Sequence, residues 1–440
     1  MRVLLGVPWY FPESVGGTEI YVRGLSRELL ETGVDVAVAA PARGTKTEYV
    51  HDGVHVFRFE GDPAASGELN MQQDAPAAWD DILDRFAPNI VDLHSMTSLL
   101  GLPHLRAAHR RGMSTVATLH VPGVICARGT FMRYGKTPCS GNLAEEPCTA
   151  CRLEAQGVPS AVGRLLGHVP PQLGVRLRGG SLPAAAERAL TARSRDDDRR
   201  AWLDQMVECS DRLVAPSAWL ADVLQRNGVP SRKVVLCRQG VDVAAIPRAT
   251  VRRRQGPLRV GFVGRSDPVK GLDILLDAVR VVPRDAALEL HIWAIARSTT
   301  EQSYREAMIR RAHADTRVTF HDETTDHAAI YEALDVLAVP SVWLETGPLV
   351  VLEAQAAGLP VVGSNLGGIA ERVKDGEDGI LVAPGDPAAL AEALTRLAVD
   401  TERLEQLRPQ RLPRSVGDVV ADTLKTYTSL LTSEAHRLPA

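Results

Sequence analysis

Short apolar runs alternate with amphipathic helical patterns along most of the chain. Six runs rich in Val, Leu and Ile predict strands in the first half, at Arg2–Val7, Val34–Ala40, Val54–Phe59, Ile90–Leu93, Thr115–Leu119 and Arg212–Ala215. Six more predict strands in the second half, at Leu258–Val263, Leu288–Ala294, Arg317–Phe320, Val336–Val339, Pro360–Val362 and Ile380–Val382. Continuous apolar strands separated by helices are typical of parallel sheets covered on both faces. The pattern therefore predicts an α/β protein with two doubly wound domains.

Two segments interrupt this alternation. The basic, proline-bounded stretch "IPRATVRRRQGP" predicts a linker at 247–257, between a first domain of 1–246 and a second of 258–412. Residues 121–200 contain four of the six cysteines and fit the alternation poorly, so we interpret them as an insertion in the first domain. Apolar residues at helical spacing predict a C-terminal helix within 413–440, which could pack on either domain, including back on the first.

Composition narrows the class of protein. The chain has 440 residues, 45% of them hydrophobic, with a net charge of -4, a pI of about 6.3 and a mean hydropathy of -0.06. This balance excludes bulk attraction to nucleic acid or anionic lipid, and no apolar run is as long as a membrane span. The N-terminal "MRVLLGVPWYF" fits a first strand better than a signal peptide. We expect a cytoplasmic protein without an integral membrane segment; peripheral contact with the inner face of the membrane stays open.

Two loops have features that suit phosphate. Gly16-Gly17 follows the first strand and precedes a helix, so its backbone N–H groups suit a phosphate or a sugar hydroxyl, although a simple turn is the alternative. In the second half, "LRVGFVGRSDPVKG" places Arg265 and Lys270 between a buried strand and a helix start. Ligands bind at the carboxyl ends of strands in open α/β sheets. Two cations there predict a diphosphate site, with two solvated loop charges as the alternative.

Two glutamates stand in a nearly charge-free segment, "PSVWLETGPLVVLEAQAAGLPVV". Glu345 precedes a predicted helix that starts after Gly347-Pro348, and Glu353 lies inside that helix. A buried carboxylate is costly unless something satisfies it. The two carboxylates are therefore predicted to accept hydrogen bonds from the hydroxyl groups of a bound polyol. A purely structural role for both carboxylates is the alternative.

Four cysteines, Cys126, Cys139, Cys148 and Cys151, have the spacing C-x12-C-x8-C-x2-C. A C-x2-C pair with two further thiols suits tetrahedral zinc, and four cysteine ligands would leave no open position, so the role would be structural. Disulfides are disfavoured in the cytosol but stay open, as do free thiols. The acidic run Asp196–Asp198 is interpreted as a solvated charge run rather than a metal ligand.

Six blocks in order carry a family resemblance: "GGTE", "TLH", "VAPSAWL", "GVD", "GRSDPVKG" and "PSVWLETGPLVVLEAQAAGLPVVGSNLGGIAE". Over nearly its whole length the chain resembles the family-4 (group 1) retaining glycosyltransferases. The resemblance implies a GT-B fold, with two doubly wound Rossmann-like domains facing across a cleft. It implies transfer of a sugar from a nucleoside diphosphate sugar, UDP- or GDP-linked, to an acceptor such as a glycan, a lipid-linked sugar or a small molecule.

The resemblance also implies roles for single residues. His120 would lie near the anomeric carbon, Glu345 would contact the donor sugar, and Glu353 would hold the ribose hydroxyls. Arg265 and Lys270 would neutralise the diphosphate. The implied donor-binding set comprises Gly17, Arg265, Lys270, Gly347, Pro348, Leu349 and Glu353. No catalytic metal is expected.

Two departures and two competing functions accompany the resemblance. Gln239 stands where relatives commonly carry asparagine. Ala294 and Ala296 stand where relatives usually carry glycines, so the edge that binds the base could differ. A sugar-nucleotide epimerase or a phosphorylase on the same fold is one alternative function. A non-catalytic sugar-nucleotide-binding protein is the other.

Overall fold

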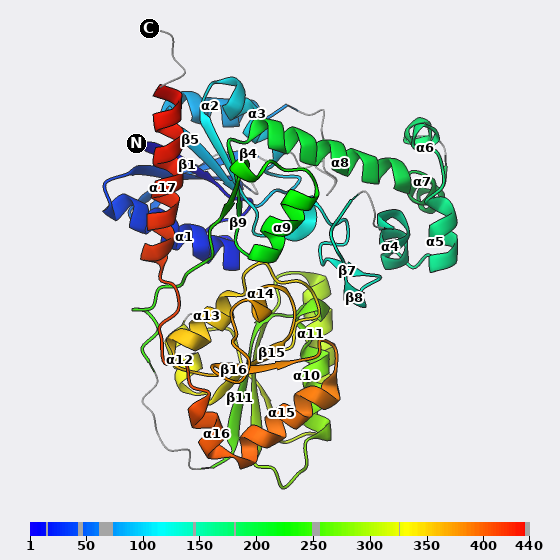
Figure 1. Ribbon diagram of the computed structural model, residues 1–440, viewed down its shortest axis with the longest axis vertical. Helices are drawn as coiled ribbons and strands as arrows, with labels where there is room; N and C mark the ends of the chain where they lie inside the picture. The colour runs from blue at the N-terminus through cyan, green and yellow to red at the C-terminus, as the bar shows by residue number, and fades with distance from the viewer. Residues whose placement is uncertain are drawn as a thin grey trace. The chain divides into compact units, whose positions relative to one another are not determined.

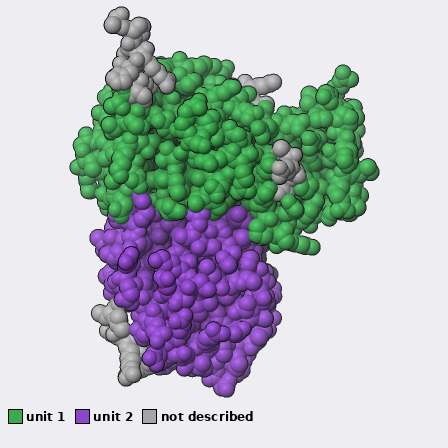
Figure 2. Space-filling model, viewed as in Figure 1, with its two compact units in different colours: residues 1–238, 417–440 green, residues 239–416 purple. Residues whose placement is uncertain are grey.

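The computed structural model describes residues 1–14, 16–42, 47–60, 74–143, 147–179, 182–248, 256–324 and 326–435. The chain divides into two compact units, which Figure 2 shows in different colours: unit 1 is 1–238 with 417–440, and unit 2 is 239–416. These divisions fall after residues 238 and 416, whereas the sequence analysis placed them near 246 and 412. Most of the linker predicted at 247–257 lies outside the described residues.

Unit 1 is built on an eight-stranded sheet in the order β10-β9-β6-β5-β1-β2-β4-β3. Its strands are β1 (Arg2–Gly6), β2 (Asp35–Ala42), β3 (Thr47–His51), β4 (Val54–Glu60), β5 (Ile90–His94), β6 (Ser114–Thr118), β9 (Arg212–Ala215) and β10 (Val234–Leu236). All neighbours pair in parallel except β3, which is antiparallel to β4. Every residue of β5 and β6 is buried, because helices cover both faces of the sheet.

The helices that follow these strands are α1 (Gly17–Glu31), α2 (Ala77–Phe86), α3 (Leu102–Arg110) and α9 (Ala218–Arg226). Each carries an apolar stripe at helical spacing. In α1 that stripe includes Val22, Leu25 and Leu29, all fully or almost fully buried. The helices that the amphipathic patterns predict between the strands therefore form the layers that cover the sheet.

One long crossover joins two neighbouring strands, because β6 pairs in parallel with β9 and residues 119–211 lie between them. It contains η1 (Pro122–Val124), β7 (Met132–Arg133), β8 (Thr137–Pro138), α4 (Cys148–Ala155), α5 (Ser160–Leu166), α6 (Pro171–Leu177), α7 (Ala184–Leu190) and α8 (Ala192–Cys209). Figure 1 shows α8 reaching away from the sheet of unit 1, with α4 to α7 grouped around its far end. In the described part of this crossover, no strand joins the eight-stranded sheet.

The interpretation of Asp196–Asp198 as a solvated charge run is wrong for Asp196. Its side chain is only 11% exposed, accepts a hydrogen bond of 2.5 Å from Thr149 Oγ1, and lies 3.4 Å from Arg152 Nε. The reason is tertiary, since α4 packs against this part of α8 and buries one charged face of the helix. Asp196 therefore joins α8 to α4.

Unit 2 has a six-stranded, fully parallel sheet in the order β13-β12-β11-β14-β15-β16. Its strands are β11 (Leu258–Arg265), β12 (Leu288–Ile295), β13 (Val318–Phe320), β14 (Val336–Val339), β15 (Val361–Ser364) and β16 (Gly379–Val382). Its helices are η3 (Pro268–Lys270), α10 (Leu272–Val281), α11 (Thr299–Ala312), α12 (His327–Glu332), α13 (Leu349–Ala356), α14 (Gly367–Ala370), α15 (Pro387–Val399) and α16 (Thr401–Gln406). The predicted doubly wound sheets are thus confirmed in both units.

All twelve predicted strands are present within a few residues, but the structure also has edge strands that the pattern did not reveal. β3 reads Thr-Glu-Tyr-Val-His and is partly exposed, and β10 has only three residues, none of them fully buried. Edge strands touch a neighbour on one side only, so they lack the continuous apolar runs of buried strands. Among the described residues, no helix is long and apolar enough to cross a membrane.

The C-terminal helix α17 (Val416–Ala435) packs within unit 1, apart from its first residue. Its Tyr427 is 1% exposed, and the hydroxyl donates a hydrogen bond of 2.8 Å to Asp92 Oδ2 at the centre of the sheet. Thr118 Oγ1 donates to the other oxygen of the same carboxylate at 2.9 Å. Burial raises the pKa of Tyr427 well above its ordinary value, so its hydroxyl remains a donor.

Tyr427→Phe should lower the free energy of unfolding of unit 1 by about 1–3 kcal/mol, because it leaves one oxygen of the buried Asp92 carboxyl without this donor. Denaturant titration with hydrogen exchange of Asp92-containing peptides measures the loss. Tyr304→Phe is the matched control, since Tyr304 Oη donates to Asp273 in unit 2 at 3.2 Å. Equal protection of unit 1 in the wild type and Tyr427→Phe would contradict the role of this bond.

Candidate functional site

The sheet of unit 2 has a point where the chain changes direction. From β11 it proceeds to β12 and β13 on one side, and then returns to β14, β15 and β16 on the other side. The connections that leave β11 and β14 therefore diverge at the carboxyl ends of two neighbouring strands. Ligands bind at such switch points in open α/β sheets. Arg265 ends β11, Lys270 follows it at the end of η3, and Glu345 follows β14.

Lys270 and Glu345 form a close ion pair at this switch point. The Lys270 Nζ lies 2.7 Å from Glu345 Oε1, which also accepts a hydrogen bond of 2.8 Å from Ser341 Oγ. Glu345 is only 4% exposed. The ammonium also lies 5.3 Å from the centre of the Trp343 ring, within cation–π range. Burial of this carboxylate is thus offset by a charge and a hydroxyl.

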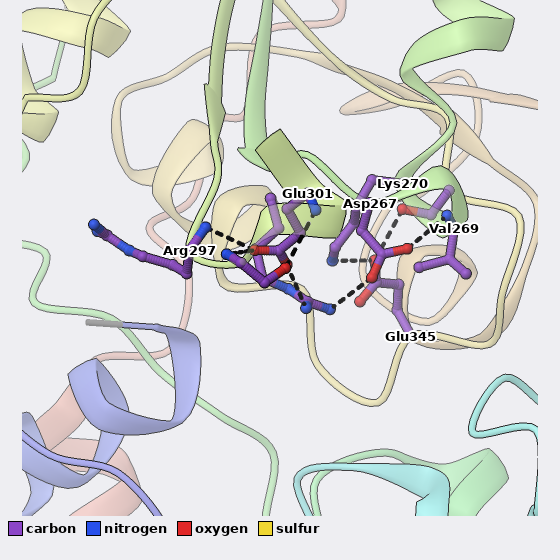
Figure 3. A network of polar contacts seen from close by, with 9 residues as sticks. Asp267, Val269, Lys270, Arg297, Glu301 and Glu345 are labelled. Carbon is purple, nitrogen blue, oxygen red and sulfur yellow. Dashed lines mark hydrogen bonds and ion pairs between the residues drawn. The ribbon is translucent and has the colours of Figure 1, made fainter. Parts of the chain in front are cut away.

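Figure 3 shows a polar network with Asp267, Glu301 and Glu345, and ion pairs with the first two join Arg265 to it. The Arg265 guanidinium is 3.2 Å from Glu301 Oε1 and 3.4 Å from Asp267 Oδ2, while half of the side chain stays exposed. Asp267 in turn accepts a hydrogen bond of 3.1 Å from the N–H of Val269. The arginine is therefore oriented by two carboxylates and still accessible to a ligand.

The two loops of the switch point are held to each other by their backbones. The N–H of Val342 donates to the carbonyl of Val269 at 2.8 Å. Gly271 has φ +73°, and a Cβ there would lie 2.1 Å from the carbonyl oxygen of Pro340. Only glycine permits this conformation and this approach together. The relative positions of Lys270 and Glu345 therefore depend on backbone packing as well as on their ion pair.

Glu353 lies on α13 and is 6% exposed. Tyr331 Oη donates a hydrogen bond of 2.5 Å to Glu353 Oε2, and His327 Nδ1 lies 3.7 Å from Oε1. The hydrogen bond to Glu353 raises the pKa of His327 above its ordinary value, in spite of partial burial. The second glutamate is thus held by a phenol and an imidazole from α12.

The predicted turn Gly347-Pro348-Leu349 leads into α13, with Pro348 at the N-cap position and Leu349 as the first helical residue. Proline has no side-chain acceptor, so it leaves the first N–H groups of the helix available at its positive end. A Cβ at Gly347 would lie 1.8 Å from Gln239 Oε1. Gln239 therefore packs directly against the turn, a contact between segments far apart in the sequence.

A pocket of about 220 Å³ lies at the carboxyl ends of β11, β12 and β13. Its wall contains Trp293 and His321, whose rings stack at 4.2 Å with an angle of 10°. Ala294 and Ala296 also line it, and Arg305 donates to the backbone carbonyl of Ala294 at 3.0 Å. The two alanines were predicted from the sequence, whereas Trp293 and His321 were not, although an aromatic residue inside the predicted strand was a visible signal.

In unit 1, the predicted site residues Gly17 and His120 follow β1 and β6. His120 is 5% exposed; its Nε2 lies 3.0 Å from His94 Nδ1, and its ring meets Tyr21 edge-on at 4.7 Å. His94 Nε2 lies 3.7 Å from Asp92 Oδ2. The sequence analysis missed His94, because only the parallel pairing of β5 with β6 brings it to His120.

Burial sets the charge state of these groups. It lowers the pKa of His94 to about 3 and that of His120 well below its ordinary value. Burial also raises the pKa of Asp92 to about 6, against the opposing hydrogen bonds from Tyr427 and Thr118. Both histidines are therefore neutral at pH 7 and present imidazole nitrogens rather than positive charge.

Comparison with known families decides the assignment. The chain matches the model of a "Glycosyl transferase 4-like domain" over residues 16–240 and that of "Glycosyl transferases group 1" over residues 257–400. The first match alone covers half of the chain. This chain is a family-4, group 1 glycosyltransferase-family protein. The matches cover every strand of unit 2, including its switch point, and every strand of the unit 1 sheet except β1.

Curated relatives of this family member include two kinds of enzyme by name. The D-inositol 3-phosphate glycosyltransferase of Corynebacterium efficiens is 35% identical over 222 residues, which are 46% of this chain and 52% of that protein. The glycogen synthase of Mycobacterium tuberculosis is 32% identical over 238 residues, or 53% and 56% of the two chains. The chain thus spans about half the length of the curated relatives it matches.

Solved structures share the fold of this family member. HepE of Anabaena, crystallised with UDP and glucose, aligns with a TM-score of 0.66 at 16% identity, covering 97% of this chain and 99% of that chain. Sucrose-phosphate synthase of Thermosynechococcus elongatus aligns with a TM-score of 0.66 at 19% identity, covering 98% and 100%. At these identities the similarity shows the GT-B fold.

Lys270→Ala and Arg265→Ala should each weaken binding of UDP or GDP by about 10- to 100-fold, because each removes a charge-assisted contact of about 1.5–3 kcal/mol. Titration calorimetry measures the affinity, with circular dichroism to verify the fold. Lys374→Ala is the matched control, since that lysine of unit 2 is 67% exposed. Unchanged affinity in both site variants would remove the diphosphate from this switch point.

Acid should destabilise unit 1 below about pH 6.5, because His94, His104 and His120 have folded-state pKa values lowered by burial. The unfolded chain binds protons there that the folded chain does not, so stability falls as pH falls. Asp92 acts in the opposite direction between pH 3.8 and about 6, and Asp196, whose pKa burial also raises, acts with it against the three histidines.

The pH dependence is measured as the urea midpoint between pH 7.5 and 5, with hydrogen exchange to assign it to unit 1. His104→Gln should reduce the slope, whereas His109→Gln on the exposed face of the same helix should not. A stability independent of pH over this range would contradict neutral burial of the three histidines.

Proposed function

We propose that this protein is a retaining glycosyltransferase that moves a sugar from a nucleoside diphosphate sugar to an acceptor hydroxyl. The observation that carries the proposal is the paired Lys270 and Glu345 at the switch point of unit 2. One side chain is suited to a phosphate and the other to sugar hydroxyls, and the start of α13 follows Glu345 by a few residues.

The donor diphosphate is assigned to Lys270, Arg265 and the first N–H groups of α13. Arg265 is half exposed and can turn toward a phosphate while Glu301 and Asp267 keep its orientation. A planar guanidinium and an ammonium next to a helix N-terminus together offset the charge of a diphosphate. This set also explains why an otherwise apolar loop keeps a buried carboxylate, since Glu345 balances Lys270.

The nucleoside is assigned to Glu353 on α13 and to the pocket at the carboxyl ends of β11, β12 and β13. Glu353 would accept hydrogen bonds from the ribose hydroxyls, in a position set by Tyr331 and His327. The base would enter the pocket lined by Trp293 and His321, which lies at the carboxyl ends of β11, β12 and β13. Ala294 and Ala296 narrow that pocket relative to glycines, so they are candidates for setting which base fits.

The chemistry requires departure of a diphosphate from an anomeric carbon. The bond between C1 and the phosphate oxygen breaks, positive charge develops on the sugar, and negative charge develops on the diphosphate. Fixed cations and backbone N–H groups around the diphosphate stabilise that charge without reorganisation. The acceptor oxygen bonds to C1 on the face that the diphosphate leaves, and its proton passes to the departing phosphate oxygen. The products are a glycoside with retained configuration and a nucleoside diphosphate.

The names of the relatives support sugar transfer as the reaction, but they do not agree on one substrate. Two of the relatives are named for different compounds, D-inositol 3-phosphate and glycogen. HepE was crystallised with UDP and with UDP-glucose, which makes UDP the first nucleotide to try. The proposal therefore specifies a nucleoside diphosphate sugar and leaves its sugar and the acceptor to experiment.

The proposed activity is tested with a panel of radiolabelled UDP- and GDP-sugars and a mixed pool of acceptors. Transfer of label to an acceptor, with the anomeric configuration of the donor in the product by NMR, is the expected result. Conversion of the donor to its epimer, or release of sugar phosphate with added phosphate, would assign one of the other activities. Donor binding without turnover across the panel would contradict an enzyme.

Glu353→Ala should raise the donor KM by about 10- to 100-fold with little change in kcat, because ribose contacts are present in both the ground and the transition state. Glu345→Ala should instead act mainly on kcat, since orientation of the sugar matters most as its bond breaks. Steady-state kinetics separate the two, with Glu392→Ala, 72% exposed on α15, as the control.

Because removal of Glu353 leaves the buried Tyr331 hydroxyl without its acceptor, Glu353→Gln is measured beside it. The glutamine oxygen can still accept from Tyr331, so this variant reports on the ligand more than on the fold. An opposite kinetic pattern, with kcat lost in Glu353 variants and KM raised in Glu345 variants, would exchange the two roles.

A further inference from the structure

The four cysteines of the long crossover in unit 1 come together around one pocket. Cys126, Cys139, Cys148 and Cys151 all line it, although they span a stretch of the chain with two β-strands and a helix start. All four belong to the described residues and are free thiols in the structure. We propose that they form a structural site for one zinc ion.

Three segments of the local fold carry the four cysteines. Cys126 precedes the hairpin of β7 and β8, and Cys139 directly follows β8. Cys148 is the first residue of α4, and Cys151 lies three residues later on the same face of that helix. The C-x2-C spacing of Cys148 and Cys151 is typical of structural zinc sites, which take four ligands in all.

Backbone N–H groups point at three of the four sulfurs. The N–H of Phe131 lies 3.4 Å from Cys126 Sγ, that of Tyr134 3.2 Å from Cys151 Sγ, and that of Gly141 3.4 Å from Cys139 Sγ. A neutral thiol is a weak acceptor, whereas a metal-bound thiolate carries negative charge and is a strong one. The donors are therefore those that outer hydrogen bonds to zinc thiolates require.

Two of these donors come from backbone that is unfavourable for their residue type. Phe131 and Tyr134 both have φ of 52°, in the left-handed region that bulky side chains rarely adopt. Such conformations persist only when the surrounding structure holds them. Here they direct N–H groups at Cys126 and Cys151, and bonds to metal-bound thiolates would offset their cost.

The charges around the pocket fit the same ion. Zinc with four thiolates has a net charge of about -2. Arg128, Arg133 and Arg152 line the pocket together with the cysteines. Arg128 is further fixed by a hydrogen bond of 3.1 Å to the carbonyl of Cys151. Arg128 also pairs with Glu154 at 2.6 Å and Arg152 with Asp196 at 3.4 Å, so these two guanidinium groups offset the charge of the thiolates only in part.

The thiols lie around the pocket without forming a finished coordination sphere. Within the described ranges, no group of three or more His, Cys, Asp or Glu side chains is so arranged that it could hold a metal ion as it stands. A cysteine side chain reorients by rotation about one torsion, χ1, between staggered positions. The proposal therefore requires the sulfurs to turn inward on a backbone that already surrounds one point.

Zinc is favoured because four cysteines without an open position make a closed, structural site for a soft ligand set. Such an ion would join the hairpin of β7 and β8 to α4. The assembled part is in turn attached to the rest of unit 1 through Thr149, which donates to Asp196 on α8, and through the Phe131 ring, which meets Trp219 on α9 edge-on at 5.3 Å. Loss of zinc should loosen this part and leave unit 2 intact.

The test uses the full chain purified under reducing conditions from medium that contains zinc and iron. Elemental analysis should find one zinc per chain, lost in Cys148→Ser and in Cys126→Ser. Cys209→Ser is the matched control, because Cys209 ends α8 and does not line the pocket. Cobalt exchanged for zinc should show the thiolate charge-transfer absorption of a tetrahedral sulfur site.

A second measurement avoids variants that fail to fold. Removal of metal from the wild type by a chelator should increase hydrogen exchange in peptides of residues 126–143 and 147–155, and added zinc should restore protection. Titration with UDP should be unchanged, since unit 2 does not contain the cysteines. These readouts need no sugar transfer, so failure here and failure of the proposed activity are distinguishable.

Three results would overturn the zinc site. The first is an absence of zinc in the wild type, with all four cysteines reactive as free thiols. The second is a pair of disulfides among them by mass spectrometry. The third is iron in place of zinc, with the absorption of an iron–sulfur centre.

Discussion

The structure around the candidate site depends on the satisfaction of one buried carboxylate. Glu345 lies in an apolar loop with almost no exposure, where an unpaired negative charge would be costly. Lys270 and Ser341 satisfy it, and they are brought there by the close approach of the loops after β11 and β14. That approach requires glycine at position 271, because a side chain would collide with the backbone of Pro340. The ion pair of the site therefore depends on the same close packing of the two loops that glycine at position 271 permits.

Unit 1 uses the same edge of a parallel sheet in a different electrostatic way. It contains a buried acid–histidine cluster. His120 contacts His94, and His94 in turn lies close to Asp92. Burial keeps the imidazoles neutral, whereas unit 2 presents fixed cations. The fixed cations of unit 2 suit a diphosphate, whereas the neutral imidazoles of unit 1 form hydrogen bonds without adding charge.

Much of this could be read from the chain before folding, and for a physical reason. Strands covered on both faces are largely apolar, so the ten central strands were visible as runs, and β9 and β14 even had the predicted bounds. The edge strands β13 and β16 of unit 2 are apolar enough to have been predicted as well. The loops after β11 and β14 were visible because charges and glycines are unusual beside such strands. Exposed edge strands such as β3 and β10 carry no such requirement, and they were missed.

The sequence by itself determined the two sheets, the order of their elements along the chain, the two cations after a buried strand, Glu345 in a loop and Glu353 inside a helix. Only the tertiary structure decided which distant residues meet. Asp92 and Tyr427 are separated by 335 residues, yet one hydrogen bond joins them. Gly347 and Gln239 are also far apart in the sequence, yet they pack against each other. Hydrophobic periodicity reports whether a position is buried, but it holds no information about the partner, because that partner is set by strand order and by how loops approach one another in three dimensions.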